Sequence, residues 1–201
     1  MTTDPDELTY LRVMLAKKRK RNSYWKWPDR LVEERGIASE ILGQVYENVA
    51  GMCSLEQGQD PPDCEATLDG RFSGVEVTEL IDQPTLEQNL RQSGSRRYFD
   101  WDNPKFLAAL QDRIDAKDRA WKGGYERRVL VIHTDEFVLD RDTVGRFLEG
   151  ALFRTTFITD AFLGLSYHPS VEPEGGCYPV FRLELHHAGG RPLAVGGEAG
   201  G

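Results

Sequence analysis

Two strand-like runs joined by a tight turn, within residues 61–80, constrain the fold of this chain more than any other feature. Residues 63–68 mix threonine with aliphatic side chains, and residues 74–80 are β-branched and alternating. Asp69-Gly70, between the two runs, is a strong signal for the turn of a short hairpin. The sequence therefore predicts a β-hairpin.

Asp63 and Glu76 stand on the two strand-like runs of this hairpin. Because side chains alternate between the faces of a strand, Glu76 and Thr78 share one face and Glu79 points to the other. If the neighbouring strand presents Asp63 at the same height, the carboxylates of Asp63 and Glu76 come within reach of one divalent cation, which prefers oxygen ligands. A cation held there can also bind phosphate oxygens, which is the chemistry of phosphodiester cleavage.

At these residues the chain resembles the PD-(D/E)xK nuclease superfamily. Pro62-Asp63 matches the PD, and Glu76-Val77-Thr78 stands where (D/E)xK belongs, with threonine in place of the lysine. The resemblance implies a metal-dependent nuclease that hydrolyses phosphodiester bonds of nucleic acid, with DNA favoured. It implies Mg²⁺ as the cofactor, with Mn²⁺ as the alternative ion, bound by Asp63, Glu76 and the Val77 carbonyl. Two other interpretations stay open: a catalytically inactive module that binds nucleic acid or a partner, and a hydrolase of another phosphate ester.

The predicted elements around the hairpin follow the order αβββαβ, which is the order of that superfamily's core. The resemblance thus implies an α/β protein with a restriction-endonuclease-like core, a mixed central sheet and flanking helices. Apolar spacing, turn signals and caps predict these elements: a helix over residues 37–50, strands over 52–57, 63–68 and 74–80, a helical region that restarts at Asn103-Pro104 and runs to about 121, and a buried strand over 128–133.

Further elements follow this core. Asp142 or Thr143 can cap a helix that runs to about Phe153. Strands are predicted over residues 161–167 and 178–185, and we expect them to pair. The chain therefore adds a C-terminal helix and a β-hairpin to the core.

Lys117 stands inside an apolar helical stripe. At about 100° per residue, the stripe is formed by Leu107, Leu110, Ile114 and Trp121. A lysine in such a stripe can extend its ammonium to solvent along the apolar surface. The alternative is that Lys117 directs its charge into the cleft and supplies the catalytic cation that Thr78 lacks, as lysines migrate in the superfamily that the chain resembles.

The first predicted helix offers a further acidic ligand. Glu40, Gln44 and Glu47 lie nearly opposite its apolar face, which is typical of a solvated polar stripe. Members of the superfamily often add a glutamate from this helix to the metal site. We select Glu47 as the extra metal ligand because it lies nearer the strands in sequence.

The N-terminal segment is strongly basic in an acidic chain. Between Arg12 and Arg30 it carries eight basic residues and one acidic residue, whereas the whole chain has a formal charge of −8. Interleaved cations and aromatic rings can bind phosphates and stack on bases. A solvated helix end and a localisation signal are the alternatives. The nucleic-acid-binding candidates are Lys17, Lys18, Arg19, Lys20, Arg21, Trp25 and Lys26.

Composition and motifs place the chain among intracellular globular proteins. We expect a basic arm or helix over residues 1–35, a single nuclease-like domain over 36–187 and a disordered Gly-rich tail over 188–201. Phosphate-loop, dinucleotide-binding and nucleophile-elbow motifs are absent, as are paired zinc-ligand motifs. No apolar run suits a membrane span or a signal peptide, so we expect a cytoplasmic protein without membrane contact. A homodimer is left open.

Overall fold

The computed structural model describes residues 30–55, 61–82, 100–120, 124–136, 138–165 and 179–187. The chain divides into two compact units, Met1–Arg30 and Leu31–Gly201. The elements described below belong to the second unit, except that its first helix begins at Arg30.

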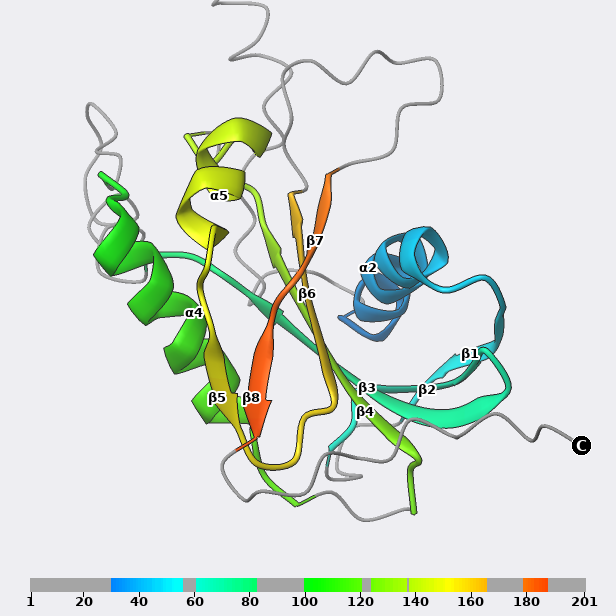
Figure 1. Ribbon diagram of the computed structural model, residues 1–201. Coiled ribbons are helices and arrows are strands. Elements are labelled where there is room, and N and C mark those ends of the chain that lie inside the picture. Colours follow the sequence, from blue (N-terminus) through cyan, green and yellow to red (C-terminus); the bar gives the residue numbers. More distant parts are fainter. Residues whose placement is uncertain are drawn as a thin grey trace, which may run out of the picture. The chain divides into compact units, whose positions relative to one another are not determined.

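Helices and two sheets form this part of the protein (Figure 1). The helices are α2 (Arg30–Val45), α4 (Asn103–Lys117) and α5 (Arg141–Leu148). The strands are β1 (Val49–Ser54), β2 (Cys64–Leu68), β3 (Arg71–Glu79), β4 (Arg127–Thr134), β5 (Phe153–Thr155), β6 (Asp160–Leu165), β7 (Val180–Arg182) and β8 (Leu185–His187). The predicted α/β class is confirmed.

The central sheet is mixed, as expected, with the order β1-β2-β3-β4-β6-β7. Strands β1, β2 and β3 pair antiparallel, whereas β3, β4 and β6 are parallel, and β7 runs antiparallel to β6. Parallel neighbours need a long crossover, which α4 supplies between β3 and β4 and α5 supplies between β4 and β6. Strands β5 and β8 form a separate parallel pair.

The helices cover both faces of this sheet, with α2 on one side and α4 and α5 on the other (Figure 1). Alternate residues of β4 enter the two cores: Val129 and Val131 pack with α2, and Leu130 and Ile132 pack with α4. This follows from the two-residue period of a strand. The two faces of the sheet are therefore distinct compartments.

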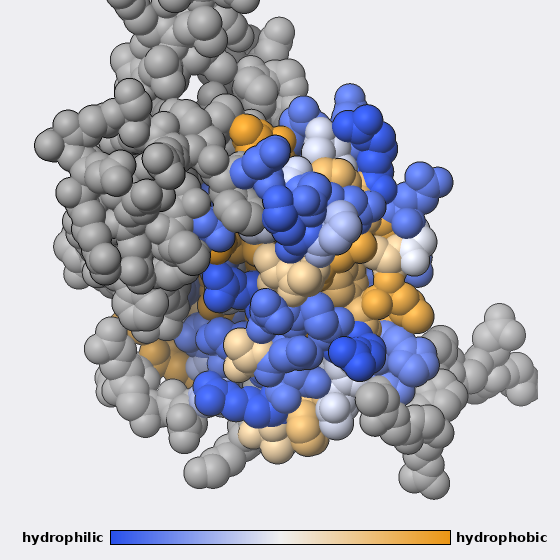
Figure 2. Space-filling model, turned by 90° about the vertical axis from the view of Figure 1, so that its left-hand side faces the viewer, coloured by the Kyte–Doolittle hydropathy of each residue, from blue (hydrophilic) through white to orange (hydrophobic). Residues whose placement is uncertain are grey.

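The α4 helix is amphipathic. Phe106, Leu110 and Ile114 are fully buried, while Asp112 and Asp115 are exposed. Figure 2 faces the side on which α4 lies in Figure 1, and the described surface there is largely hydrophilic with small hydrophobic areas. No helix in the described ranges is long and apolar enough to cross a bilayer.

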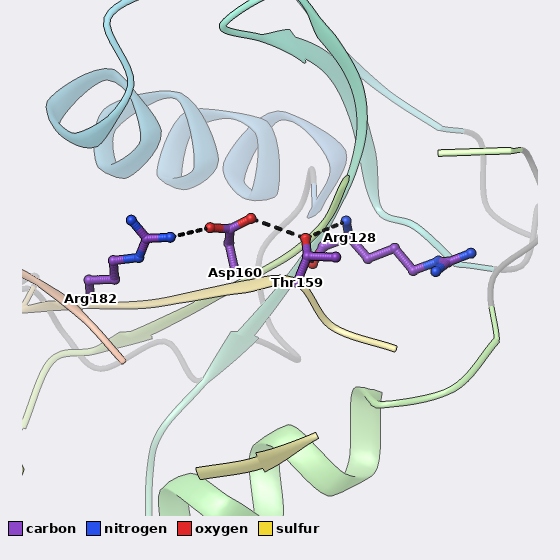
Figure 3. A network of polar contacts seen from close by, with 4 residues as sticks. All are labelled: Arg128, Thr159, Asp160 and Arg182. Carbon is purple, nitrogen blue, oxygen red and sulfur yellow. Dashed lines mark hydrogen bonds and ion pairs between the residues drawn. The ribbon is translucent and has the colours of Figure 1, made fainter. Parts of the chain in front are cut away.

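Polar contacts join three strands of the sheet at one end (Figure 3). The Thr159 hydroxyl accepts from the Arg128 backbone N–H at 3.0 Å and lies 3.0 Å from Asp160 Oδ2. Arg182 pairs with Asp160 Oδ1 at 2.7 Å. Because the Arg182 side chain is 71% exposed, this pair, which links β6 to β7, contributes little to stability.

The hairpin turn forms as predicted. Asp69 and Gly70 both have positive φ, 46° and 77°, which is the conformation of a two-residue type I′ turn. The Asp69 carboxylate also accepts from the Asn48 backbone N–H at 2.9 Å. This contact links the turn to the segment that leads into β1.

The first helix differs from its prediction of residues 37–50, since α2 begins at Arg30 and ends at Val45. It ends early because Val49 and Ala50 pair with β2, and this strand pairing overrides the helical periodicity. The first strand therefore begins at 49 and not at 52. The expected boundary between residues 35 and 36 lies inside α2.

The later caps and strands were also misplaced. Asp102, and not Asn103, caps α4, because its carboxylate accepts from the Lys105 backbone N–H at 2.9 Å. Asp140 caps α5, and Phe153 belongs to β5 instead of to the helix. The predicted strand over 178–185 covers β7, which pairs with β6 as expected, but only the first residue of β8, which pairs with β5.

Candidate active site

Asp63 and Glu76 lie side by side on the α4 face of the sheet. Cys64 pairs with Val75 across β2 and β3, and both pack toward α2. Their neighbours Asp63 and Glu76 therefore point to the opposite face, at matching height. The sequence-based expectation of two carboxylates on one face is met.

The Asp63 side chain is also bound to the backbone of β3. Its Oδ2 accepts from the Val77 N–H at 2.8 Å. A strand residue directs its N–H and C=O to the same side, so the Val77 carbonyl faces the same edge of β3 as Asp63. Three groups with oxygen donors thus meet at this edge, namely two carboxylates and one carbonyl.

Lys117 completes the group from the last residue of α4. Its Nζ lies 2.5 Å from Glu76 Oε2. The Glu76 side chain is 2% exposed and that of Lys117 is 22% exposed, so the ion pair is largely shielded from water. A cation at a helix C-terminus is also favoured by the helix dipole. The Lys117 side chain thus points toward the carboxylates and does not extend its ammonium away from them into solvent.

The carboxylate pair carries an electrostatic conflict. Burial and then the Glu76 charge raise the pKa of Asp63 to about 6, although the Val77 N–H and Lys117 act to lower it. Two carboxylates in contact disfavour each other's ionised form, and an added cation relieves this repulsion. The site is therefore short of positive charge at neutral pH even with Lys117 in place.

Asp118 fixes the end of α4 that carries Lys117. Its carboxylate accepts from the Thr155 hydroxyl at 2.9 Å and from the backbone N–H groups of Thr156, Phe157 and Ile158 at 2.5, 2.7 and 3.0 Å. Burial alone would raise the pKa of Asp118, but these N–H donors hold it below its usual value. The β5–β6 turn and the C-terminus of α4 are thus joined at the residue next to Lys117.

Another acidic side chain on the same face is engaged elsewhere. Glu65 lies two residues beyond Asp63 on β2, and its Oε1 accepts from the Tyr125 hydroxyl at 2.5 Å. Burial, then this hydrogen bond, raises the pKa of Tyr125. Within the described ranges, no group of three or more His, Cys, Asp or Glu side chains is placed to hold a metal ion.

The structure does not bring Glu47 to this group. Glu47 is exposed and stands next to Asn48, whose N–H contacts Asp69 in the hairpin turn. That turn is at the opposite end of β2 from Asp63. The choice of Glu47 failed because proximity in sequence does not translate into proximity across an antiparallel pair.

A different residue of the first helix is buried. Glu34, on α2, is 3% exposed, and burial followed by the charges of Asp63 and Glu34 raises the pKa of the Cys64 thiol to about 12. Sequence analysis missed Glu34, although it precedes Ala38 by four residues and so falls in the apolar stripe, as Lys117 does on α4. Glu34 lies on the α2 face of the sheet, whereas Asp63 and Glu76 lie on the α4 face.

Thr78 and the basic arm are the other predicted parts of the site. Thr78 is half-buried and shares the face of Glu76. The basic-arm candidates, Lys17 to Arg21 with Trp25 and Lys26, lie outside the described residues.

Oxygen donors of this kind fit a hard divalent cation. Mg²⁺ binds through one or two carboxylates and keeps several waters, which matches a site with two carboxylates and a nearby carbonyl. Lys117 engages only one of the two Glu76 oxygens. Comparisons with protein-family models, curated proteins and solved structures find no match to this chain.

Proposed function

We propose that this protein is a metal-dependent nuclease that hydrolyses phosphodiester bonds of nucleic acid, with DNA as the favoured substrate. The observation that carries the proposal is the group formed by Asp63, Glu76 and Lys117, in which Lys117 Nζ lies 2.5 Å from Glu76. The residue just before β2, the middle of β3 and the last residue of α4 contribute one side chain each. A charged group assembled in this way from distant parts of the sequence is typical of functional sites.

A restriction-endonuclease-like core belongs to the same proposal. The described elements α2, β1, β2, β3, α4 and β4 follow the order αβββαβ. The carboxylates stand at the start of β2 and within β3, where the PD and (D/E)xK residues of that superfamily are expected. Order and site therefore support one assignment.

Each residue has a distinct part in the proposed reaction. Asp63, Glu76 and the Val77 carbonyl would hold the cation. When bound, Mg²⁺ acts as a Lewis acid on the phosphate and lowers the pKa of a bound water. In the hydrolysis, the water oxygen bonds to phosphorus, the bond to the leaving sugar oxygen breaks, and that oxygen takes up a proton.

Lys117 supplies the positive charge that Thr78, which stands in place of the motif lysine, cannot supply. Its ammonium stands beside Glu76, where it can donate to a phosphate oxygen and stabilise the negative charge that develops there. Asp63 and Glu76 keep this ammonium oriented before the substrate arrives. The reacting centre is thereby positioned by residues of β3 and of α4, which precede and follow the connection between these two elements.

The second candidate function is a binding module without catalysis. The short ion pair between Lys117 and Glu76 favours it, because this pair neutralises one of the two carboxylates. In that case the protein would bind nucleic acid but would not cut it.

The test uses single- and double-stranded DNA and RNA with Mg²⁺, Mn²⁺ or a chelator. Asp63→Asn and Glu76→Gln preserve side-chain shape, and Asp112→Asn, on the exposed face of α4, is the matched control. Cleavage that is lost in chelator and in both site variants, but kept in the control, supports the enzyme. Binding of nucleic acid with no cleavage under any condition supports the module, and cleavage that survives in chelator contradicts the metal site.

A further inference from the structure

Arg113 is a second cation on the side of α4 that carries Lys117. The two residues are four apart, so they lie one above the other on the helix, about 6 Å apart along its axis. Arg113 is half-buried, and its Nη2 donates to the Ile81 carbonyl oxygen at 3.3 Å. Its Nε is buried and has no hydrogen-bond partner among the residues that the structure describes.

Arg113 differs from Lys105, Lys117 and Arg182, each of which pairs with a carboxylate in the described ranges. Lys105 pairs with Asp102 at 2.9 Å, and Arg182 pairs with Asp160 at 2.7 Å. Arg113 forms no ion pair with any carboxylate in the described parts of the chain, and a backbone carbonyl is its acceptor. Arginine presents a planar fork of donors that fits phosphate, so a held but uncompensated guanidinium is suited to an anion.

The path from the carboxylates to Arg113 follows the edge of β3. The register of β2 with β3 ends at Cys64 and Val75, and none of the described strands pairs with that edge of β3 beyond Val77. Lys117 meets β3 at Glu76, and Arg113 meets the chain at Ile81, just after β3 ends. Two cations of one helix therefore flank this stretch, with the carboxylate pair at one end.

We infer that Arg113 binds a second phosphate of the substrate strand, next to the phosphate that is cleaved. The ligand class is a polynucleotide with at least two consecutive phosphodiesters, laid along the β3 edge from Glu76 toward Ile81. This inference rests on the proposed function, because it takes the carboxylate pair as the position of the cleaved phosphate. It gives a role to an arginine that a carbonyl anchors on the side of α4 that carries Lys117.

The experiment measures binding of a fluorescent single-stranded DNA oligonucleotide at a series of salt concentrations, in chelator so that no cleavage occurs. Arg113→Gln removes the charge, Arg113→Lys keeps it without the fork, and Arg35→Gln, at an exposed position of α2, is the control. Loss of one phosphate contact should lower the magnitude of the slope of log K against log salt by about 0.7 in Arg113→Gln. The Lys variant should keep the slope and bind less tightly, and the control should match the wild type.

A parallel assay compares cleavage of the oligonucleotide with that of bis(4-nitrophenyl) phosphate, which contains a single phosphodiester. Arg113→Gln should raise KM for the oligonucleotide about tenfold and leave KM for bis(4-nitrophenyl) phosphate unchanged. A slope that does not change in Arg113→Gln, an equal change in Arg35→Gln, or no binding by the wild type overturns the inference. A changed slope in a protein that never cleaves would contradict the nuclease but support the Arg113 contact.

Discussion

Lys117 Nζ lies 2.5 Å from Glu76 Oε2, so the last residue of α4 neutralises a carboxylate in the middle of β3. The two residues are 41 positions apart in the chain. Because Glu76 is 2% exposed, removal of the lysine leaves a buried carboxylate beside Asp63 with no cation. Stability therefore depends on this contact, and so does the cleavage that we propose.

Replacing Lys117 tests its catalytic part. Lys117→Met keeps the length of the side chain but not its charge, and we expect the cleavage rate at saturating Mg²⁺ to fall by a factor on the order of 10² to 10³, as for loss of one charge-stabilising donor. Stability should fall by about 1–3 kcal/mol because the buried Glu76 carboxylate loses its partner. Single-turnover cleavage and urea unfolding give the two numbers, and unchanged cleavage by a folded variant would refute the role.

Stability should depend on pH through Asp63. Its folded-state pKa of about 6 is raised above the usual 3.8, so the folded protein holds this proton more tightly than the unfolded chain. The resulting stabilisation is present below pH 4 and is lost as the pH rises through about 6. In chelator, Asp63→Asn should therefore gain roughly 1–3 kcal/mol relative to wild type between pH 4 and pH 8. If the free energy of unfolding changed with pH in the same way in both proteins, the repulsion between Asp63 and Glu76 would be absent.

Asp118 should act as a positioning residue for Lys117. Asp118→Ala removes the acceptor for one hydroxyl and three N–H groups, which should cost about 2–4 kcal/mol and slow cleavage. Hydrogen exchange at Thr156, Phe157 and Ile158 should accelerate. Asp115→Ala, on the exposed side of the same helix, should leave those amides protected, and equal acceleration in both variants would contradict the clamp.

Gly164 tests the packing of α2 on the sheet. A Cβ at Gly164 would lie 2.4 Å from Ile41 Cδ1 and 2.9 Å from Ile41 Cγ1. Gly164→Ala should therefore destabilise the protein by about 1–3 kcal/mol through overpacking. Ile41→Val removes the Cδ1 atom and should recover part of this loss in the double variant. Additive effects of the two substitutions in urea unfolding would mean that Ile41 does not occupy this space.

The sequence predicted those parts of the fold whose local pattern agrees with their tertiary contacts. The hairpin was found because β2 and β3 alternate and Asp69-Gly70 fits its turn. Strands β5 and β8 were missed because each has three residues, too few to show a period, and their pairing joins segments far apart in sequence. The end of α2 was misplaced because long-range pairing decides where the helix gives way to β1.

The site residues, like the fold, could be predicted only where the local sequence pattern reveals them. Lys117 could be found because a charge inside an apolar stripe is a visible exception to the pattern. The same exception at Glu34 lay outside the predicted helix and was not recognised. Arg113 carried no such signal, since its proposed role rests on a contact with the Ile81 carbonyl that the sequence pattern does not reveal.

The most direct test of the account compares two glutamates of one strand. Glu76 and Glu79 lie on opposite faces of β3, so Glu76→Gln alters the carboxylate pair and Glu79→Gln does not. The measurement is Mg²⁺-dependent cleavage of end-labelled DNA by both variants at matched folded concentration. We predict that Glu76→Gln loses cleavage and that Glu79→Gln retains it. Cleavage by Glu76→Gln at the wild-type rate would contradict the proposed site.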